Sequence, residues 1–129
     1  MATYLLDTNI IIDTINGKKG RADLLKNLIL QGNTLACCPI NIAEVYAGMR
    51  PKEEVRTTAL LRSLQLFPIT FQVAGEAGLL KRDYAKTGIT LGLADALIAA
   101  VAIHNKLTLI TENLKHFPMR ELALYPLPA

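Results

Sequence analysis

Short apolar runs alternate along the chain with stretches whose apolar residues recur at helical spacing. The first run stops at Asp7-Thr8-Asn9, as is typical of a buried strand that leads into a loop or helix. Such runs predict strands at residues 3–6, 34–38, 67–70 and 107–110, with a last edge strand in the proline-containing segment 122–127. Helical spacing predicts helices at residues 10–15, 22–31, 41–49, 52–66, 73–86 and 93–104. This alternation indicates an α/β domain whose mostly parallel sheet is covered by helices on both faces.

Composition supports a compact chain. Apolar residues make up 51% of the sequence and charged residues 19%, which excludes a disordered protein. The 129 residues contain no internal repeat or linker-like stretch, so we expect one domain over residues 1–129. No apolar run reaches the roughly 18 residues of a membrane span, and Asp7 interrupts any secretory signal. We therefore expect a cytoplasmic protein that does not enter a membrane.

Cysteine usage and net charge add little beyond this. Cys37 and Cys38 are adjacent, so in a strand they would point to opposite faces and could not pair with each other. We interpret them as buried reduced thiols, which fits a reducing compartment. The net charge of +3 permits a polyanionic partner without requiring one.

Three separated carboxylates are the candidate chemistry. Asp7 follows the first strand, and Asp95 lies in the first turn of the apolar helix 93–104. Glu44 is expected in the first turn of the helix after the second strand, which Asn41 would cap. Strand carboxyl ends and helix N-termini share one edge of a parallel α/β layer, so these acids are expected to meet there. Grouped carboxylates repel each other unless a cation lies between them, and oxygen ligands favour Mg²⁺ or Mn²⁺ over zinc.

Each acid also has a purely structural interpretation. Asp7 or Thr8 can cap the helix that begins near Asn9. Glu44 stands three residues after Asn41, which resembles a capping box. Asp95 is harder to explain in this way, because an acid beside so apolar a helix is costly unless it binds something or caps the helix.

Four motifs resemble the PIN-domain ribonucleases, and within that family the VapC-type toxins of toxin–antitoxin pairs. They are Tyr4-Leu5-Leu6-Asp7-Thr8-Asn9, Asn41-Ile42-Ala43-Glu44-Val45-Tyr46-Ala47-Gly48, Leu93-Ala94-Asp95-Ala96-Leu97-Ile98-Ala99-Ala100, and Leu109-Ile110-Thr111-Glu112-Asn113 followed by His116-Phe117. They occur in the family's order and spacing and cover almost the whole chain.

The resemblance implies a three-layer α/β/α fold and Mg²⁺- or Mn²⁺-dependent hydrolysis of RNA. Asp7 and Asp95 would be the main metal ligands, and Glu44 would complete the cluster directly or through a water. The ion would activate the attacking water and offset charge on the scissile phosphate. A homodimer, a cognate antitoxin and a structured RNA substrate such as transfer or ribosomal RNA are implied as well.

The last motif departs from the family pattern. The family often supplies a fourth acid there, whereas this chain has Asn113 and His116, which puts a second metal ion in doubt. Asn113 can still bind a water on the metal, and His116 can contact phosphate. Glu112 is a substitute only if its side chain points inward, which is not expected if Asn113 does so.

Further residues have weaker roles. Thr8 and Asn9 either orient Asp7 or a bound water, or simply cap a helix. Asp13 and Asp83 are expected on solvated helix faces, and His104 at a helix end or surface. The basic residues near the acidic edge line a possible RNA path or are ordinary solvated charges; they are Lys18, Lys19, Arg21, Arg50, Lys52 and Lys115.

Two other functions compete with an RNA-cleaving toxin. The missing fourth acid favours a catalytically weak or inactive PIN-like module that binds RNA or a protein partner. A phosphate-accepting signalling domain would need an Asp after its third strand, but Phe71-Gln72 follows residues 67–70. The sequence argues against that second alternative.

Overall fold

The computed structural model describes residues 1–128, which fold around a parallel sheet of five strands. The strands are β1 (Thr3–Leu6), β2 (Thr34–Cys37), β3 (Gln65–Leu66), β4 (Thr108–Ile110) and β5 (Ala123–Leu124). They lie in the order β3-β2-β1-β4-β5, and every neighbouring pair is parallel. After β1, the chain adds β2 and β3 on one side of it and then β4 and β5 on the other. The order of strands therefore switches between β1 and β4, where ligands of α/β sheets bind at the carboxyl ends.

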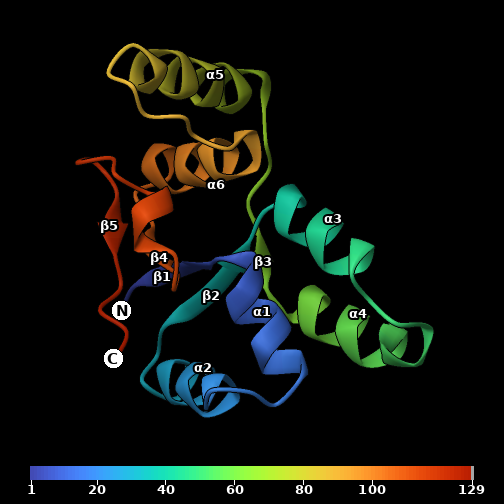
Figure 1. Ribbon diagram of the computed structural model, residues 1–129. Coiled ribbons are helices and arrows are strands. Elements are labelled where there is room, and N and C mark those ends of the chain that lie inside the picture. The colour runs from blue at the N-terminus through green and yellow to red at the C-terminus, as the bar shows by residue number, and fades with distance from the viewer. Residues whose placement is uncertain (129) are drawn as a thin grey trace.

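Helices cover both faces of this sheet (Figure 1). The pair α5 (Phe71–Ala85) and α6 (Leu93–His104) lies on one face, with α6 nearer the strands. The other face carries α1 (Thr8–Ile15), α2 (Arg21–Leu30), α3 (Pro39–Ala47) and α4 (Glu54–Ser63). Two short 3₁₀ turns, η1 (Pro51–Glu53) and η2 (Leu114–His116), complete the elements. The expected three-layer α/β/α architecture is confirmed.

Successive residues of a strand pack into two separate hydrophobic cores, one on each face of the sheet. Leu5 and Leu109 pack with α5 and α6, whereas Leu6 and Ile110 pack with the helices of the opposite face. Cys37 and Cys38 divide in the same way, and both are buried free thiols, as expected from the alternation of a strand. Strands buried on both faces explain why the sequence shows apolar runs in place of an apolar–polar alternation.

Several predicted boundaries are wrong, and the edge strand expected at 122–127 covers only Ala123–Leu124. The third strand is Gln65–Leu66 and not 67–70, because Pro68 has no N–H for the ladder; Phe67 N still donates to Cys37 O at 2.9 Å. The helix expected at 52–66 consequently stops at Ser63. The helix expected to begin at Asn41 begins at Pro39, a residue that suits a first helical position. Within residues 1–128, no helix is long and apolar enough to cross a bilayer.

Burial within α2 gives a direct test of the fold. Leu25 is 4% exposed and Leu30 is 74% exposed, although both lie in this helix. We expect Leu25→Ala to lower the free energy of unfolding by about 2–5 kcal/mol through lost burial and a cavity, and Leu30→Ala by less than about 0.5 kcal/mol. Urea denaturation of both variants measures this difference. Equal losses would show that α2 does not pack as described.

Candidate active site

Asp7 lies where β1 ends and α1 begins. It is the N-cap of α1, and its Oδ1 accepts a hydrogen bond from Thr8 N at 2.8 Å. Its Oδ2 accepts a second hydrogen bond, from Thr111 Oγ1 at 2.7 Å, across the gap to the loop after β4. The residue is only 5% exposed. Asp7 can therefore cap α1 and still bind a ligand at the switch point, because a carboxylate oxygen that accepts one hydrogen bond keeps a free lone pair.

Glu44 has no capping role. Cys38 is the N-cap of α3, and its backbone N donates to Asn41 Oδ1 at 2.8 Å, so Asn41 occupies the position expected for the acid of a capping box. The expectations that Asn41 caps the helix and that Glu44 lies in its first turn are thus wrong by three residues. Glu44 is exposed in the second turn, and Thr8 Oγ1 donates to its Oε1 at 2.6 Å.

Asp95 lies in the first turn of α6, as predicted, with its side chain 28% exposed. Its Oδ2 is 3.3 Å from His116 Nδ1. Burial raises the pKa of this carboxyl, His116 opposes the rise, and the charges of Asp7 and Glu44 add to it. Thr8 links Asp7 to Glu44, and Asp95 lies beside His116 in the turn that follows β4, so all three acids lie at the same edge of the sheet.

The donor set around these acids is hard and oxygen-rich. Burial raises the pKa of the nearby Cys38 thiol, which disfavours the thiolate form that a soft metal would need. Among residues 1–128, no three acid, histidine or cysteine side chains converge tightly enough to hold an ion as they stand. Each acid instead accepts a hydrogen bond from a neighbour or lies beside His116, so one cation could bind all three only after side-chain movement.

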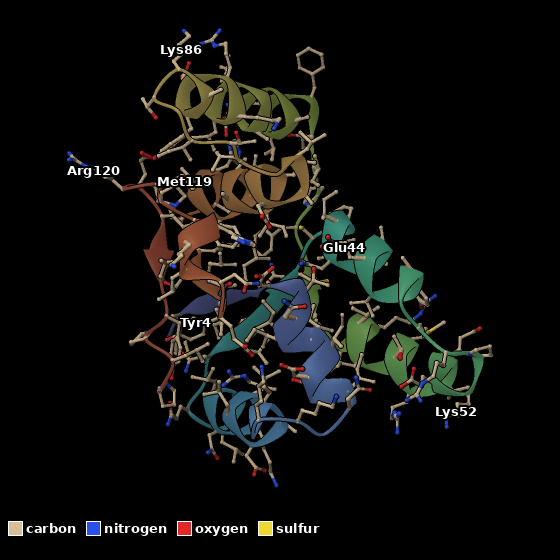
Figure 2. The ribbon with its side chains drawn as sticks, in the orientation of Figure 1. Tyr4, Glu44, Lys52, Lys86, Met119 and Arg120 are labelled. Carbon is tan, nitrogen blue, oxygen red and sulfur yellow. The ribbon has the colours of Figure 1, made fainter. Side chains whose placement is uncertain are left out.

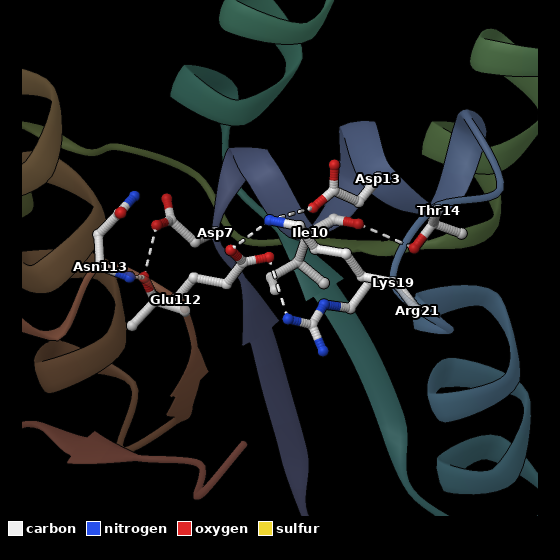
Figure 3. Close-up of polar contacts among 9 residues, drawn as sticks. Asp7, Ile10, Asp13, Thr14, Lys19, Arg21, Glu112 and Asn113 are labelled. Atoms are coloured by element: carbon white, nitrogen blue, oxygen red, sulfur yellow. Dashed lines mark hydrogen bonds and ion pairs between the residues drawn. The ribbon is translucent and has the colours of Figure 1, made fainter. Parts of the chain in front are cut away.

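The last motif places its residues on two sides of the loop after β4. Thr111 is buried and donates to Asp7, and Asn113 N donates to Thr111 Oγ1 at 3.0 Å. Asn113 extends on the Asp7 side, whereas Glu112 reaches toward Lys19 and Arg21 (Figure 3). These cations hold the pKa of Glu112 at about 2 through hydrogen bonds from Lys19 and then Arg21. Glu112 therefore does not replace the missing acid.

Several of the basic residues expected on the RNA path already form ion pairs within the protein. Arg21 is buried, which does not support its expected contact with RNA. Both Lys19 and Arg21 form ion pairs with Glu112. Arg50 forms two side-chain hydrogen bonds with Glu53. Lys18 and Lys115 are exposed and form no ion pair in the described part of the chain. Lys52 is exposed too, but at the far end of the α3–α4 connection from Glu44 (Figure 2).

The other residues considered in the sequence are Asn9, Asp83, His104 and Asp13. Asn9 is exposed, and no hydrogen bond from its side chain is found among residues 1–128. Asp83 and His104 lie at the surface as expected, the latter 3.2 Å from Glu76. The solvated position expected for Asp13 is wrong, because its side chain is only 15% exposed beside Lys19.

Two residues of this network were not assigned a site role from the sequence. Asn41 is fully buried, and its Nδ2 donates to Thr8 Oγ1 at 3.1 Å, which aims the Thr8 hydroxyl at Glu44. Thr111 is 1% exposed and supports Asp7. Both occur inside the recognised motifs, and a buried amide or hydroxyl close to an acid was the available signal.

A family model for the PIN domain matches residues 4–120. The chain belongs to the PIN-domain family. Ribonuclease VapC10 of Mycobacterium tuberculosis is 36% identical over 117 residues, which cover 91% of this chain and 87% of that protein. The VapBC2 structure from Rickettsia felis, bound to a DNA fragment from its promoter, superposes on this PIN domain with a TM-score of 0.84 at 28% identity, covering 95% and 97% of the two chains. A toxin–antitoxin complex from Klebsiella pneumoniae superposes with a TM-score of 0.77 at 30% identity, covering 93% and 95%.

The Thr8 hydroxyl provides a test of this network. Thr8→Val removes the acceptor of the buried Asn41 amide and the donor to Glu44. We expect this variant of the PIN domain to lose about 1–3 kcal/mol of unfolding free energy, because an unpaired buried amide pays its desolvation cost. Thr8→Ser keeps the hydroxyl and is the matched control. If chemical denaturation gave Thr8→Val the stability of the wild type, the network would not be as described.

Proposed function

We propose that this PIN domain is an endoribonuclease that uses one Mg²⁺ or Mn²⁺ ion, and that it acts as the toxin of a toxin–antitoxin pair. The observation that supports the proposal is that Thr8 links Asp7 to Glu44 and that Asp95 lies beside His116 at the same edge of the sheet. Burial raises the pKa of Asp95, the charges of Asp7 and Glu44 raise it further, and a bound cation would stabilise the charged form of all three acids. The ribonuclease name of the VapC10 relative supports the choice of reaction.

Asp7 and Asp95 are the proposed main ligands, with Glu44 binding directly or through a water. Their oxygens suit Mg²⁺ or Mn²⁺, and the raised pKa of the buried Cys38 thiol disfavours the thiolate that a softer metal would need. When bound, such an ion supplies an activated water and offsets negative charge on the phosphate. Because Asn113 and His116 replace the further acid of many relatives, we propose a single ion.

The protein's own groups position these ligands and the substrate. Thr111 and the Thr8 backbone fix both oxygens of Asp7, and the Thr8 hydroxyl fixes Glu44. The N-terminal end of α6 adds a partial positive charge beside Asp95, which favours phosphate oxygens there. The exposed Lys18 and Lys115 are proposed to contact the RNA backbone, with His116 and Asn113 closer to the scissile bond.

Substitution of the ligands tests this function. Asp7→Asn and Asp95→Asn each remove a metal-binding charge, and we expect at least about a 100-fold loss of Mn²⁺-dependent RNA cleavage, since such an ion provides several kcal/mol of transition-state stabilisation. Asp83→Asn is the matched control, because Asp83 is exposed and pairs with Arg82 on α5. Cleavage of a structured RNA pool such as transfer RNA, scored by sequencing of the new ends, is the measurement. Full activity of both ligand variants would contradict the proposal.

One observation favours a catalytically inactive module as the second candidate. The acids do not converge on an ion in residues 1–128, and the fourth acid is missing. An inactive module would bind RNA in the wild type and in Asp7→Asn alike, and would cleave it at no concentration of Mg²⁺ or Mn²⁺. Binding by electrophoretic mobility shift, run beside the cleavage assay, separates the two candidates.

The proposed partners are a cognate antitoxin and a second copy of this chain. Solved relatives from Rickettsia felis and Klebsiella pneumoniae are toxin–antitoxin complexes, which supports the first of these. We expect the protein encoded beside this chain to co-purify with it and to suppress its RNA cleavage. Light scattering after size-exclusion chromatography should give twice the mass of 14.1 kDa for the free protein. A monomer at all concentrations would rule out the homodimer.

A further inference from the structure

Two acids and two bases form a charged cluster beside the active site, and their formal charges cancel. Glu112 Oε2 lies 2.9 Å from Lys19 Nζ, and Glu112 Oε1 lies 3.0 Å from Arg21 Nη2. Asp13 Oδ2 lies 3.8 Å from Lys19 Nζ. We call these four residues the charged clamp (Figure 3). The side chain of Arg21 is 11% exposed and that of Glu112 is 25% exposed, so solvent screens this contact less than an ordinary surface ion pair.

The connection between α1 and α2 is shaped to present the basic half of the clamp. Lys19 has a φ of 57°, in the left-handed region that side chains rarely adopt, and it lies between Gly17 at 66° and Gly20 at 65°. The Lys18 backbone N donates to Asp13 O at 2.8 Å and closes this turn. This turn places the Lys19 ammonium within ion-pair distance of Glu112.

Glu112, one of the two acids of the clamp, lies between two residues of the proposed active site. Glu112 follows Thr111, whose hydroxyl donates to Asp7, and precedes Asn113, whose backbone N donates to that hydroxyl. The loop after β4 is thus joined to the start of α1 through Asp7. The clamp joins the same loop to the residues that follow the end of α1. Held at both ends of α1, the loop keeps the Thr111 hydroxyl directed at Asp7 Oδ2.

We propose that Glu112 is a positioning residue that tunes the divalent-metal affinity of Asp7 through Thr111, and that Lys19 and Arg21 serve this clamp and do not bind RNA. This inference rests on the proposed metal-dependent function. Partners that orient a metal ligand from outside the coordination sphere typically change metal affinity or activity by 10–100-fold when they are removed. We expect an effect in that range.

The RNA-contact interpretation and the clamp predict different changes in Glu112→Gln. If Lys19 and Arg21 bound RNA, removal of the opposing acid would free them, so KM for RNA would fall. If they serve the clamp, Glu112→Gln and Lys19→Met would share one phenotype, which is weaker Mn²⁺ binding with KM for RNA unchanged at saturating metal. Glu121→Gln is the matched control, because Glu121 is exposed and in no ion pair of the described chain.

The experiment is a titration of Mn²⁺ into the RNA-free protein. Electron paramagnetic resonance measures the concentration of free Mn²⁺ at each step. We expect Glu112→Gln and Lys19→Met to bind Mn²⁺ about 10–100-fold more weakly than the wild type. The doubly substituted Glu112→Lys, Lys19→Glu protein restores one ion pair of opposite sense and should recover part of the affinity. In the metal-free protein, hydrogen exchange of the Asn113 amide should be faster in Glu112→Gln, since that amide donates to the Thr111 hydroxyl.

Failure of the clamp and failure of the metal site give different results. If Asp7→Asn loses Mn²⁺ binding while Glu112→Gln binds like the wild type, the clamp is overturned and the metal site stands. If the wild type and Asp7→Asn bind Mn²⁺ equally, the metal site itself is overturned. A fall in KM for RNA in Glu112→Gln, with Mn²⁺ binding unchanged, would return Lys19 and Arg21 to the RNA path. If Glu112→Gln fails to fold, Lys19→Met and the doubly substituted protein decide the question.

Discussion

The proposed active site depends on the hydrogen bond between the Thr111 hydroxyl and the buried Asp7 carboxylate. This contact joins the ends of β1 and β4, the two strands between which the order of the sheet switches. A buried carboxylate is costly unless hydrogen bonds satisfy it, and Asp7 obtains one from Thr111 and one from the first turn of α1. Thr8 extends the same network to Glu44 and Asn41. The fold and the arrangement of acids are therefore held by one set of polar contacts.

Most of the architecture follows from the sequence because both cores are simple. The sequence contains apolar runs of the length of one strand and a very apolar helix, Leu93–His104. These features leave few alternatives to a parallel sheet with helices on both faces. The third strand was placed two residues late because Phe67 and Ile69 are apolar for a different reason. They pack against the α5–α6 core, whereas the ladder of β3 uses the exposed Gln65 and Leu66.

The site was predictable at Asp7 and Asp95, whose positions depend only on where an element ends or begins. It was less predictable at Glu44, because its apparent capping role required Asn41 to be the N-cap, whereas Cys38, three residues earlier, caps the helix. The pairing of Glu112 with Lys19 and Arg21 joins residues more than 90 positions apart, and no local pattern reports such a contact. Charge counts along the chain therefore overestimated the cations free to meet RNA.

The claim that Asp7, Glu44 and Asp95 hold one divalent ion is tested most directly by crystals of the protein grown with Mn²⁺. Anomalous diffraction locates manganese without any assumption about activity. The account predicts a single peak in contact with Asp7 and Asp95 oxygens, with Glu44 bound directly or through one water. A peak at another site, or none near Asp7 at millimolar Mn²⁺, would contradict it.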